Sequence, residues 1–241
     1  MLRHHILLGC TALSLILAAP VAQANLVSNG GFETTTHGPG QFGYNTVATG
    51  WASNGYNFIF AAGTADTTGS PGQYGDLKLW GPNSGSANGL PAASPHGGNY
   101  VGADGAYHVG AITQTVSGLT VGAKYALSFD WAGAQQSGFN GQTTEQWQVT
   151  FGSQTQSTEI VTVPSHGFSG WMSKTFIYTA NNTSQVLSFL AIGTPTGTPP
   201  FSLLDGVSID AVAAPEPATL SILGLGLAAI AGLRRRVKSA V

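Results

Sequence analysis

The segment Tyr125-Ala126-Leu127-Ser128-Phe129-Asp130-Trp131 alternates large apolar side chains with small or polar ones. A period of two places the apolar side chains on one face of a strand, so this segment is predicted to be a half-buried β-strand. Trp147, Val149 and Phe151 alternate with polar residues in the same way. No sustained 3.6-residue period occurs in residues 25–214, and this part of the chain is therefore predicted to be all-β.

Two further segments extend the strand pattern. Residues 186–192 are apolar on both faces, which predicts a central strand, and Leu203, Val207 and Ile209 predict another alternating strand. Asn-Gly and Asp-Gly pairs mark frequent turns, while residues 34–98 are rich in Gly, Ser, Thr, Asn and Pro and are expected to form long loops between short strands. Together these features favour an antiparallel β-sandwich of the jelly-roll kind.

Charge is scarce in this sequence. Only 7% of the residues are charged, against about 25% in an average soluble domain. Residues 25–214 contain three lysines, nine acidic residues and no arginine, a net charge of −6. This acidic balance argues against nucleic acid as a partner and is compatible with cations and neutral sugars. The single cysteine excludes a disulfide framework.

Residues 1–24 are predicted to be a secretory signal peptide. A short polar start is followed by an apolar run over residues 6–19, and Ala22 and Ala24 supply the small residues that signal peptidase reads before cleavage after Ala24. The alternative is a lipoprotein signal at Cys10, but the apolar segment that precedes this cysteine is too short.

The C-terminus has three consecutive parts. Pro215-Glu216-Pro217 is followed by an apolar stretch over residues 218–233 and then by Arg234-Arg235-Arg236. Sixteen helical residues reach about 24 Å, short of a hydrocarbon core of about 30 Å, and arginine side chains can extend to cover the difference. The basic cluster is expected to stay cytoplasmic, which leaves the body of the protein outside the inner membrane. The alternative is an ordinary C-terminal membrane anchor.

This tripartite tail, residues 215–241, resembles the PEP-CTERM sorting signal of Gram-negative bacteria. The resemblance implies that an exosortase, a membrane transpeptidase, processes the tail near Pro-Glu-Pro. The inner membrane would then hold the protein only transiently through its C-terminal transmembrane helix. Proteins of this kind are typically delivered to the cell surface or extracellular matrix of bacteria that form exopolysaccharide.

The body, residues 25–214, resembles galactose-binding-like jelly rolls. The resemblance is carried by Asn25-Leu26-Val27-Ser28-Asn29-Gly30-Gly31-Phe32-Glu33, by Gly50-Trp51, and by the strand-like segments 112–116, 125–131 and 203–209. The fold that it implies is a two-sheet antiparallel sandwich whose first and last strands are neighbours.

The same resemblance implies a structural calcium ion held by Glu33 and Asp205. Carboxylates are the hard oxygen ligands that calcium prefers. The strand pattern places Asp205 on the same face as Val207 and Ile209, where a carboxylate needs a partner or a cation. One ligand is missing, because Gly206 stands where relatives often carry a second Asp. The alternative is that both carboxylates accept hydrogen bonds from backbone N–H groups in turns.

Several aromatic residues lie in the loop-rich half of the chain. Flat aromatic faces pack against the C–H surfaces of sugars. Trp80 and Tyr107 are the candidate glycan contacts, and the alternative for Trp80 is a structural role without ligand contact. For Trp51 the core is the favoured placement.

Catalytic motifs are missing from the sequence. There is no Gly-x-Ser-x-Gly elbow, phosphate loop or His-Glu-x-x-His pattern. The sequence therefore favours a non-enzymatic surface or matrix protein that associates with exopolysaccharide. A polysaccharide-acting hydrolase would need a pair of carboxylates, for which Asp104, Asp130, Glu145 and Glu159 are the candidates. The third alternative is a structural coat protein without a ligand.

Overall fold

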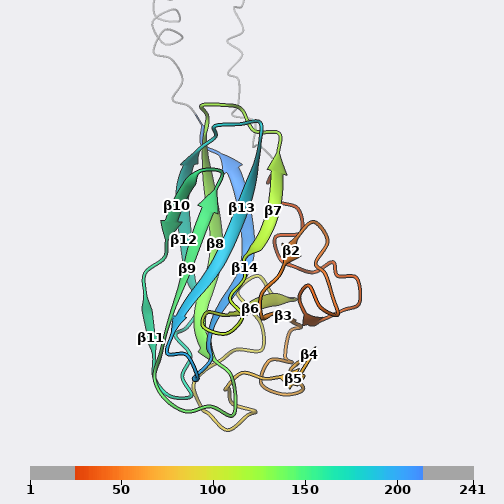
Figure 1. Cartoon of the computed structure of the whole chain (residues 1–241), viewed down its shortest axis with the longest axis vertical. Coiled ribbons are helices and arrows are strands. Elements are labelled where there is room, and N and C mark those ends of the chain that lie inside the picture. The colour runs from red at the N-terminus through yellow and green to blue at the C-terminus, as the bar shows by residue number, and fades with distance from the viewer. Residues whose placement is uncertain (1–24, 214–241) are drawn as a thin grey trace, which may run out of the picture. The chain divides into compact units, whose positions relative to one another are not determined.

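The computed structural model describes residues 25–213, which form fourteen strands (Figure 1). The predicted signal helix and transmembrane helix lie outside these residues. Within residues 25–213 no helix is long and apolar enough to span a membrane. The strands are β1 (Gly40–Gln41), β2 (Ala52–Ser53), β3 (Asn57–Phe60), β4 (Ser70–Gly72), β5 (Gly75–Leu77), β6 (Tyr100–Asp104), β7 (Ile112–Ser117), β8 (Lys124–Gln135), β9 (Thr143–Phe151), β10 (Gln154–Ser157), β11 (Val161–Val163), β12 (Met172–Thr179), β13 (Ser184–Thr194) and β14 (Pro200–Ala211).

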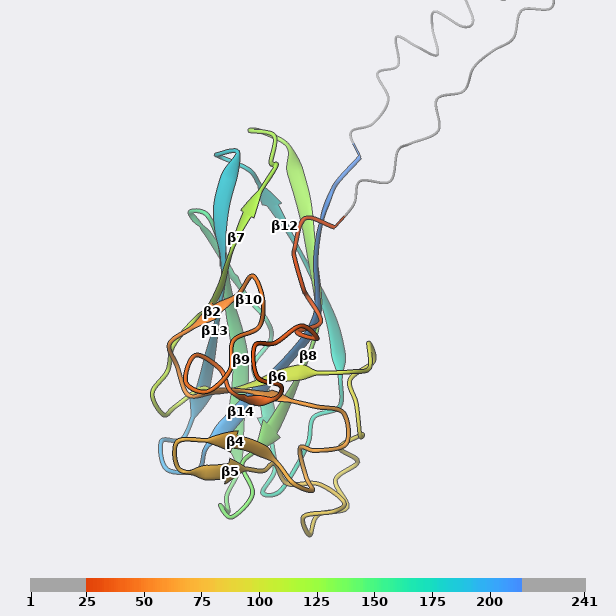
Figure 2. The same ribbon diagram turned by 90° about the vertical axis from the view of Figure 1, so that its right-hand side faces the viewer.

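The strands form two antiparallel six-stranded sheets and one hairpin. The first sheet has the order β1-β3-β6-β14-β8-β12, and the second has the order β10-β9-β13-β7-β2 with β11 also paired to β9. The hairpin is β4-β5. It lies at the end of the domain opposite to that where β14 ends (Figures 1 and 2). The all-β antiparallel sandwich predicted from the sequence is confirmed.

Aromatic side chains from both sheets fill the space between them. Phe189 of β13 packs edge-on against Phe129 of β8 at 5.1 Å between ring centroids and against Trp147 of β9 at 5.9 Å. The indole N–H of Trp147 donates to the carbonyl of Leu203 (3.0 Å), so a hydrogen bond crosses from one sheet to the other. Burial of these rings in alternating positions explains the period of two in β8 and β9. Trp51 is also buried in this core.

A second apolar cluster covers the opposite face of the first sheet. Leu203 of β14 and Ala132 of β8 belong to it, together with Phe58, Phe60 and Leu90 from the loop-rich half of the chain. The middle of the first sheet is therefore buried on both faces. This explains why every residue of β3 and β6 is buried, although the sequence shows no clear alternation there.

The prediction that Leu203, Asp205, Val207 and Ile209 share one face is wrong. The pairing of β14 with β8 shifts register between Asp205 and Ser208, which is a β-bulge. The extra residue reverses the alternation, so Val207 and Ile209 face the inter-sheet core while Leu203 faces the second cluster. Asp205 pairs with Asp130, on the face away from the inter-sheet core.

Strand β13 is central, because it pairs with β9 on one side and β7 on the other. The expectation that both its faces are buried is wrong. Val186 is 49% exposed and Ile192 is 38% exposed, and both lie on the outer face of the second sheet. Apolar side chains on both faces of a strand thus do not require that both faces are covered.

The first described residues run along β14, as the resemblance implied. The N–H of Leu26 donates to the carbonyl of Ile209 (2.9 Å), and the N–H of Val207 donates to the carbonyl of Gly30 (3.0 Å). The Asn25 side-chain oxygen accepts a further hydrogen bond from the N–H of Ile209 (3.0 Å). These bonds connect the two ends of the domain in the absence of a disulfide.

Glu145 of β9 generates a prediction about pH. Its side chain is fully buried and neither carboxylate oxygen has a hydrogen-bond partner. Burial raises its pKa from 4.5 to about 8. The folded state thus holds this proton more tightly than the unfolded state, and the resulting stability is lost as the pH rises from about 4.5 through 8.

We therefore expect Glu145→Gln to become more stable relative to the native protein as the pH rises through this range. The gain is at most about 1.4 kcal/mol per pH unit. Urea unfolding at a series of pH values measures it. Glu159→Gln is the matched control, because Glu159 is exposed and its pKa is lowered by Lys174. A stability difference between Glu145→Gln and the native protein that does not change with pH would contradict the prediction.

Candidate functional site

An aromatic cavity lies where the β4-β5 hairpin meets the loops β8–β9 and β13–β14. Its volume is about 370 Å³. We call it the tyrosine cavity. It is lined by Tyr56, Tyr74, Asp104, Tyr107, Gln136, Phe139, Thr196, Gly197 and Pro199.

Three tyrosine rings stand at different angles around this cavity. Tyr56 meets Tyr107 edge-on, with 5.3 Å between ring centroids, and meets Tyr74 at 6.1 Å with an interplanar angle of 41°. Tyr56 is buried, whereas Tyr74 is 69% exposed and Tyr107 is 41% exposed. The cavity therefore has one fixed aromatic ring and two rings that solvent reaches.

Asp104, at the end of β6, holds Tyr107 in place. Its Oδ1 accepts hydrogen bonds from the N–H groups of Ala106 (2.8 Å) and Tyr107 (3.0 Å), the pattern of an Asx turn. Gly105 in this turn lies against the backbone of Gly193, and a side chain there would collide with it. The Asp-Gly-x-Tyr pattern of the sequence thus encodes the placement of Tyr107.

The other oxygen of Asp104 has a different environment. Asp104 is only 1% exposed, and its Oδ2 has no hydrogen-bond partner. Burial raises the pKa of Asp104 to about 6, and the two backbone hydrogen bonds oppose this rise. An acidic group with an unused acceptor therefore lies in the wall of an otherwise largely aromatic and uncharged cavity.

Trp80 and Tyr107, the two glycan-contact residues predicted from the sequence, are placed differently. Tyr107 lines the cavity. Trp80 does not: its ring lies over His166 at 3.9 Å between centroids, and its indole N–H donates to the carbonyl of Phe139 (2.9 Å). Trp80 therefore supports Phe139, which does line the cavity.

Tyr74 and Phe139 were missed by sequence reasoning. Tyr74 occupies the turn of a two-stranded hairpin, and Phe139 lies in the loop between β8 and β9. Their signal in the sequence is an aromatic residue beside turn glycines, in Gln73-Tyr74-Gly75 and Gly138-Phe139-Asn140. A large aromatic residue in a turn is not required by the sheet and is therefore a candidate for binding.

A second cavity of about 300 Å³ adjoins the first, because Tyr56 and Tyr74 line both. Its remaining lining is largely polar and includes Gln41, Asn54 and Gln73. The amide groups of such residues can exchange hydrogen bonds with hydroxyl groups.

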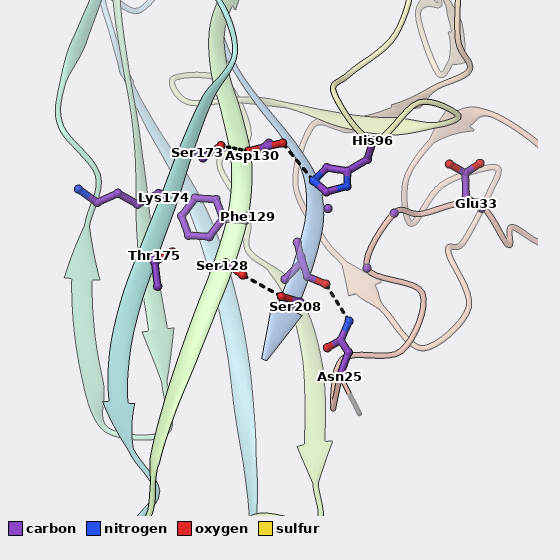
Figure 3. A pocket seen from close by; sticks show the side chains of 14 residues that line it. Asn25, Glu33, His96, Ser128, Phe129, Asp130, Ser173, Lys174, Thr175 and Ser208 are labelled. Atoms are coloured by element: carbon purple, nitrogen blue, oxygen red, sulfur yellow. Dashed lines mark hydrogen bonds and ion pairs between the residues drawn. The ribbon is translucent and has the colours of Figure 1, made fainter. Parts of the chain in front are cut away.

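A polar groove of about 650 Å³ occupies another part of the first sheet (Figure 3). We call it the N-terminal groove. One side is formed by Ser128 and Asp130 of β8 together with Ser208 of β14, and the other by Glu33 and His96 from loops (Figure 3). The Ser128 and Ser208 hydroxyls are 2.8 Å apart, and the face of the sheet here is hydrophilic.

His96, Asp130 and Ser173 interact in this groove. His96 Nε2 lies 3.0 Å from Asp130 Oδ2, and the Ser173 hydroxyl donates to Asp130 Oδ1 (2.5 Å). A serine nucleophile requires histidine between the serine and the acid. Here the acid lies between the other two, so the arrangement does not activate Ser173.

Glu33 and Asp205 approach the same point, beside Gly31. A Cβ on Gly31 would lie 3.6 Å from Asp205 Oδ1 and 3.8 Å from Glu33 Oε1. Each carboxylate also has hydrogen-bond partners. Asp205 accepts from the Ser94 hydroxyl and from the N–H of Gly206 (2.7 Å), and Glu33 accepts from the N–H of Asn99 (2.9 Å).

This geometry bears on the calcium prediction. Two converging carboxylates are a suitable start for a calcium site, but calcium takes six to eight oxygen ligands. Within residues 25–213 no group of three or more His, Cys, Asp or Glu side chains could hold a metal ion. Backbone carbonyls or water would therefore have to complete the coordination, and turn hydrogen bonds remain the alternative role for both side chains.

Comparisons with known proteins identify the tail. Residues 213–236 match the family model described as the PEP-CTERM protein-sorting motif, which confirms the sorting signal that Pro215-Glu216-Pro217 and Arg234-Arg235-Arg236 indicated. The chain is thus an exported protein whose C-terminal tail an exosortase processes. No curated protein matches the chain.

Solved structures similar to the chain have low sequence identity to it. TmCBM61, solved with beta-1,4-galactotriose, is 15% identical with a TM-score of 0.46 over 79% of this chain and all of its own. The CBM22-1 xylan-binding domain of Paenibacillus barcinonensis Xyn10C is 14% identical, with a TM-score of 0.41 over 82% of this chain and all of its own. The K1 cleaved adhesin domain of Lys-gingipain from Porphyromonas gingivalis W83 is 12% identical, with a TM-score of 0.42 over 77% of this chain and 96% of its own. Similarities of this size do not assign a function.

We propose that Glu33 and Asp205 hold a structural calcium ion and expect calcium to raise the melting temperature. An ion that binds only the folded state stabilises it by about 2.7 kcal/mol at a hundredfold excess over Kd, which raises the melting temperature of a domain of this size by roughly 5–10 °C. Thermal melts of the full-length protein with calcium and with chelator measure this. Glu33→Gln should remove most of the gain, and Asp76→Asn, an exposed acid on β5, should keep it. Identical midpoints in both buffers would assign the two carboxylates to turn hydrogen bonds.

The tail generates a prediction about mass. We propose that the exosortase cleaves near Pro215-Glu216-Pro217 and so removes the basic cluster, and we expect protein recovered from the cell surface to lack residues 234–241. Intact-mass spectrometry decides this, with protein from a strain without the exosortase as the control. Recovery of the complete tail from cells that contain the exosortase would identify the segment as an ordinary anchor.

Proposed function

We propose that the exported domain binds a polysaccharide of the cell surface or matrix and does so without catalysis. The observation that carries this proposal is the tyrosine cavity. Exposed Tyr74 and Tyr107 provide aromatic faces for the C–H surface of a sugar ring. Gln136, Thr196 and the amides of the adjoining cavity provide groups that hydrogen-bond to hydroxyls.

The carboxylates of the cavity favour binding over hydrolysis. Asp104 is the only acidic residue among those that line the tyrosine cavity and the adjoining one. A typical glycosidase uses two carboxylates about 5–10 Å apart. Glu145 and Glu159, two further candidates for such a pair, line neither cavity.

The position of the sorting signal fits this role. The motif at residues 213–236 follows directly on β14, which ends at Ala211. The tyrosine cavity lies near the start of β14, where Pro199 lines it. The ligand site therefore lies at the end of β14 opposite to Ala211, the last residue of that strand.

We expect Tyr74→Ala and Tyr107→Ala each to weaken binding of the full-length protein to the producing strain's exopolysaccharide. Loss of one stacked ring costs about 1 kcal/mol or more, which is a five- to tenfold rise in Kd. Affinity electrophoresis measures the change. Ile160→Ala, which removes an exposed apolar side chain far from the cavity residues in sequence, should bind as the native protein does.

Incubation of the protein with the same exopolysaccharide distinguishes binding from the two alternative functions. Release of reducing ends from the polysaccharide would show a hydrolase. No retardation by any matrix polysaccharide would favour a structural coat protein without a ligand.

A further inference from the structure

The tyrosine cavity contains an acidic group that no positive charge neutralises. None of its nine lining residues is Lys, Arg or His. Asp104 uses one oxygen for two backbone N–H groups, and its Oδ2 accepts no hydrogen bond. A buried carboxylate oxygen without a partner is unfavourable, so a ligand that brings positive charge or N–H donors would be stabilised beside Oδ2.

The rings of the cavity favour the same kind of ligand. Tyr56, Tyr74 and Tyr107 are inclined to one another, by 41° and 89° from Tyr56, so their faces and edges surround the space from several sides. Electron-rich aromatic faces attract a cation, and the attraction reaches about 2 kcal/mol when the cation is desolvated. Aromatic rings combined with a carboxylate are complementary to an ammonium group.

We propose that the tyrosine cavity recognises a protonated amino group carried by a sugar, as in the N-deacetylated hexosamine units of a polysaccharide. This inference rests on the proposed function for the sugar itself and adds the charge of the ligand. Asp104 supplies the negative charge, Tyr74 and Tyr107 supply the accessible ring faces, and Tyr56 forms the buried wall.

A neutral sugar would interact with the rings of the cavity but not with its charge. Its C–H faces would pack on the rings, but the charge of Asp104 would remain without a counter-charge. Since Asp104 is shielded from water, its field is screened little and acts on any cation within the cavity. The net charge of −6 on residues 25–214 attracts a positively charged polymer at longer range.

The test compares two tetrasaccharides with the same β-1,4 backbone. One is built from glucosamine and the other from N-acetylglucosamine, which lacks the positive charge. We expect the full-length protein at pH 7 to bind the glucosamine form about tenfold more tightly in isothermal titration calorimetry. Asp104→Asn should reduce the two affinities to within about twofold of each other, and Asp76→Asn, with an exposed acid on β5, should keep the preference.

A second pair of variants keeps the test valid if Asp104→Asn fails to fold. Tyr74 is exposed in the hairpin turn and belongs to neither apolar cluster, so its substitution removes no core side chain. Tyr74→Phe retains the aromatic face and should retain the preference for glucosamine, whereas Tyr74→Ala should lower the glucosamine affinity several-fold.

Three results would overturn the inference. Equal affinity for the two tetrasaccharides, or preference for the acetylated one, would show that the site does not recognise the positive charge of the sugar. Binding of the native matrix polysaccharide but of neither tetrasaccharide would reject the amino-sugar ligand and keep the proposed function. Equally tight binding of the peptide Gly-Lys-Gly would assign the cavity to amines of proteins rather than of sugars.

Discussion

The pairing of β14 with β8 is the constraint on which the rest of the structure depends. It joins the end of the chain's body to β8, which is as long as β14 itself, and places β14 in the centre of the first sheet. Because of the bulge between Asp205 and Ser208, β14 contributes side chains to both apolar clusters. Leu203 before the bulge belongs to the second cluster, and Val207 and Ile209 belong to the inter-sheet core. The N-terminal segment then pairs with β14 and connects both ends of the domain.

The same strand positions the candidate binding site. Phe201 of β14 pairs with Asp104 of β6, and the N–H of Gly105 donates to the carbonyl of Pro200 (2.9 Å). The turn that carries Tyr107 is thereby fixed to the rigid sheet. Tyr56 belongs to the second apolar cluster itself, and the hairpin that carries Tyr74 contributes Leu77 to it, so the cavity combines a rigid floor with accessible loop residues.

Charge is rare in this domain, and much of it is buried. Asp104, Asp130, Glu145 and Asp205 are each no more than 7% exposed. Acidic residues are almost never so buried without a partner. Asp130 and Asp205 have partners in the N-terminal groove, whereas Asp104 and Glu145 each keep carboxylate oxygens without one. Of these two, Glu145 lies in the core, and Asp104 lines a cavity that a ligand can enter.

The sequence by itself determined the fold class and the long strands, because the alternation in β8 and β9 is a local pattern. It also determined the sorting signal, because the order of Pro-Glu-Pro, apolar stretch and arginines is a local pattern too. The Asp-Gly-x-Tyr turn of Tyr107 is equally local. Only the tertiary structure decided which face Asp205 takes, since a bulge depends on the partner strand. It also decided that Tyr74 and Phe139 line one cavity with Tyr107 while Trp80 does not, because contacts between segments that are distant in the sequence depend on the packing of the whole domain.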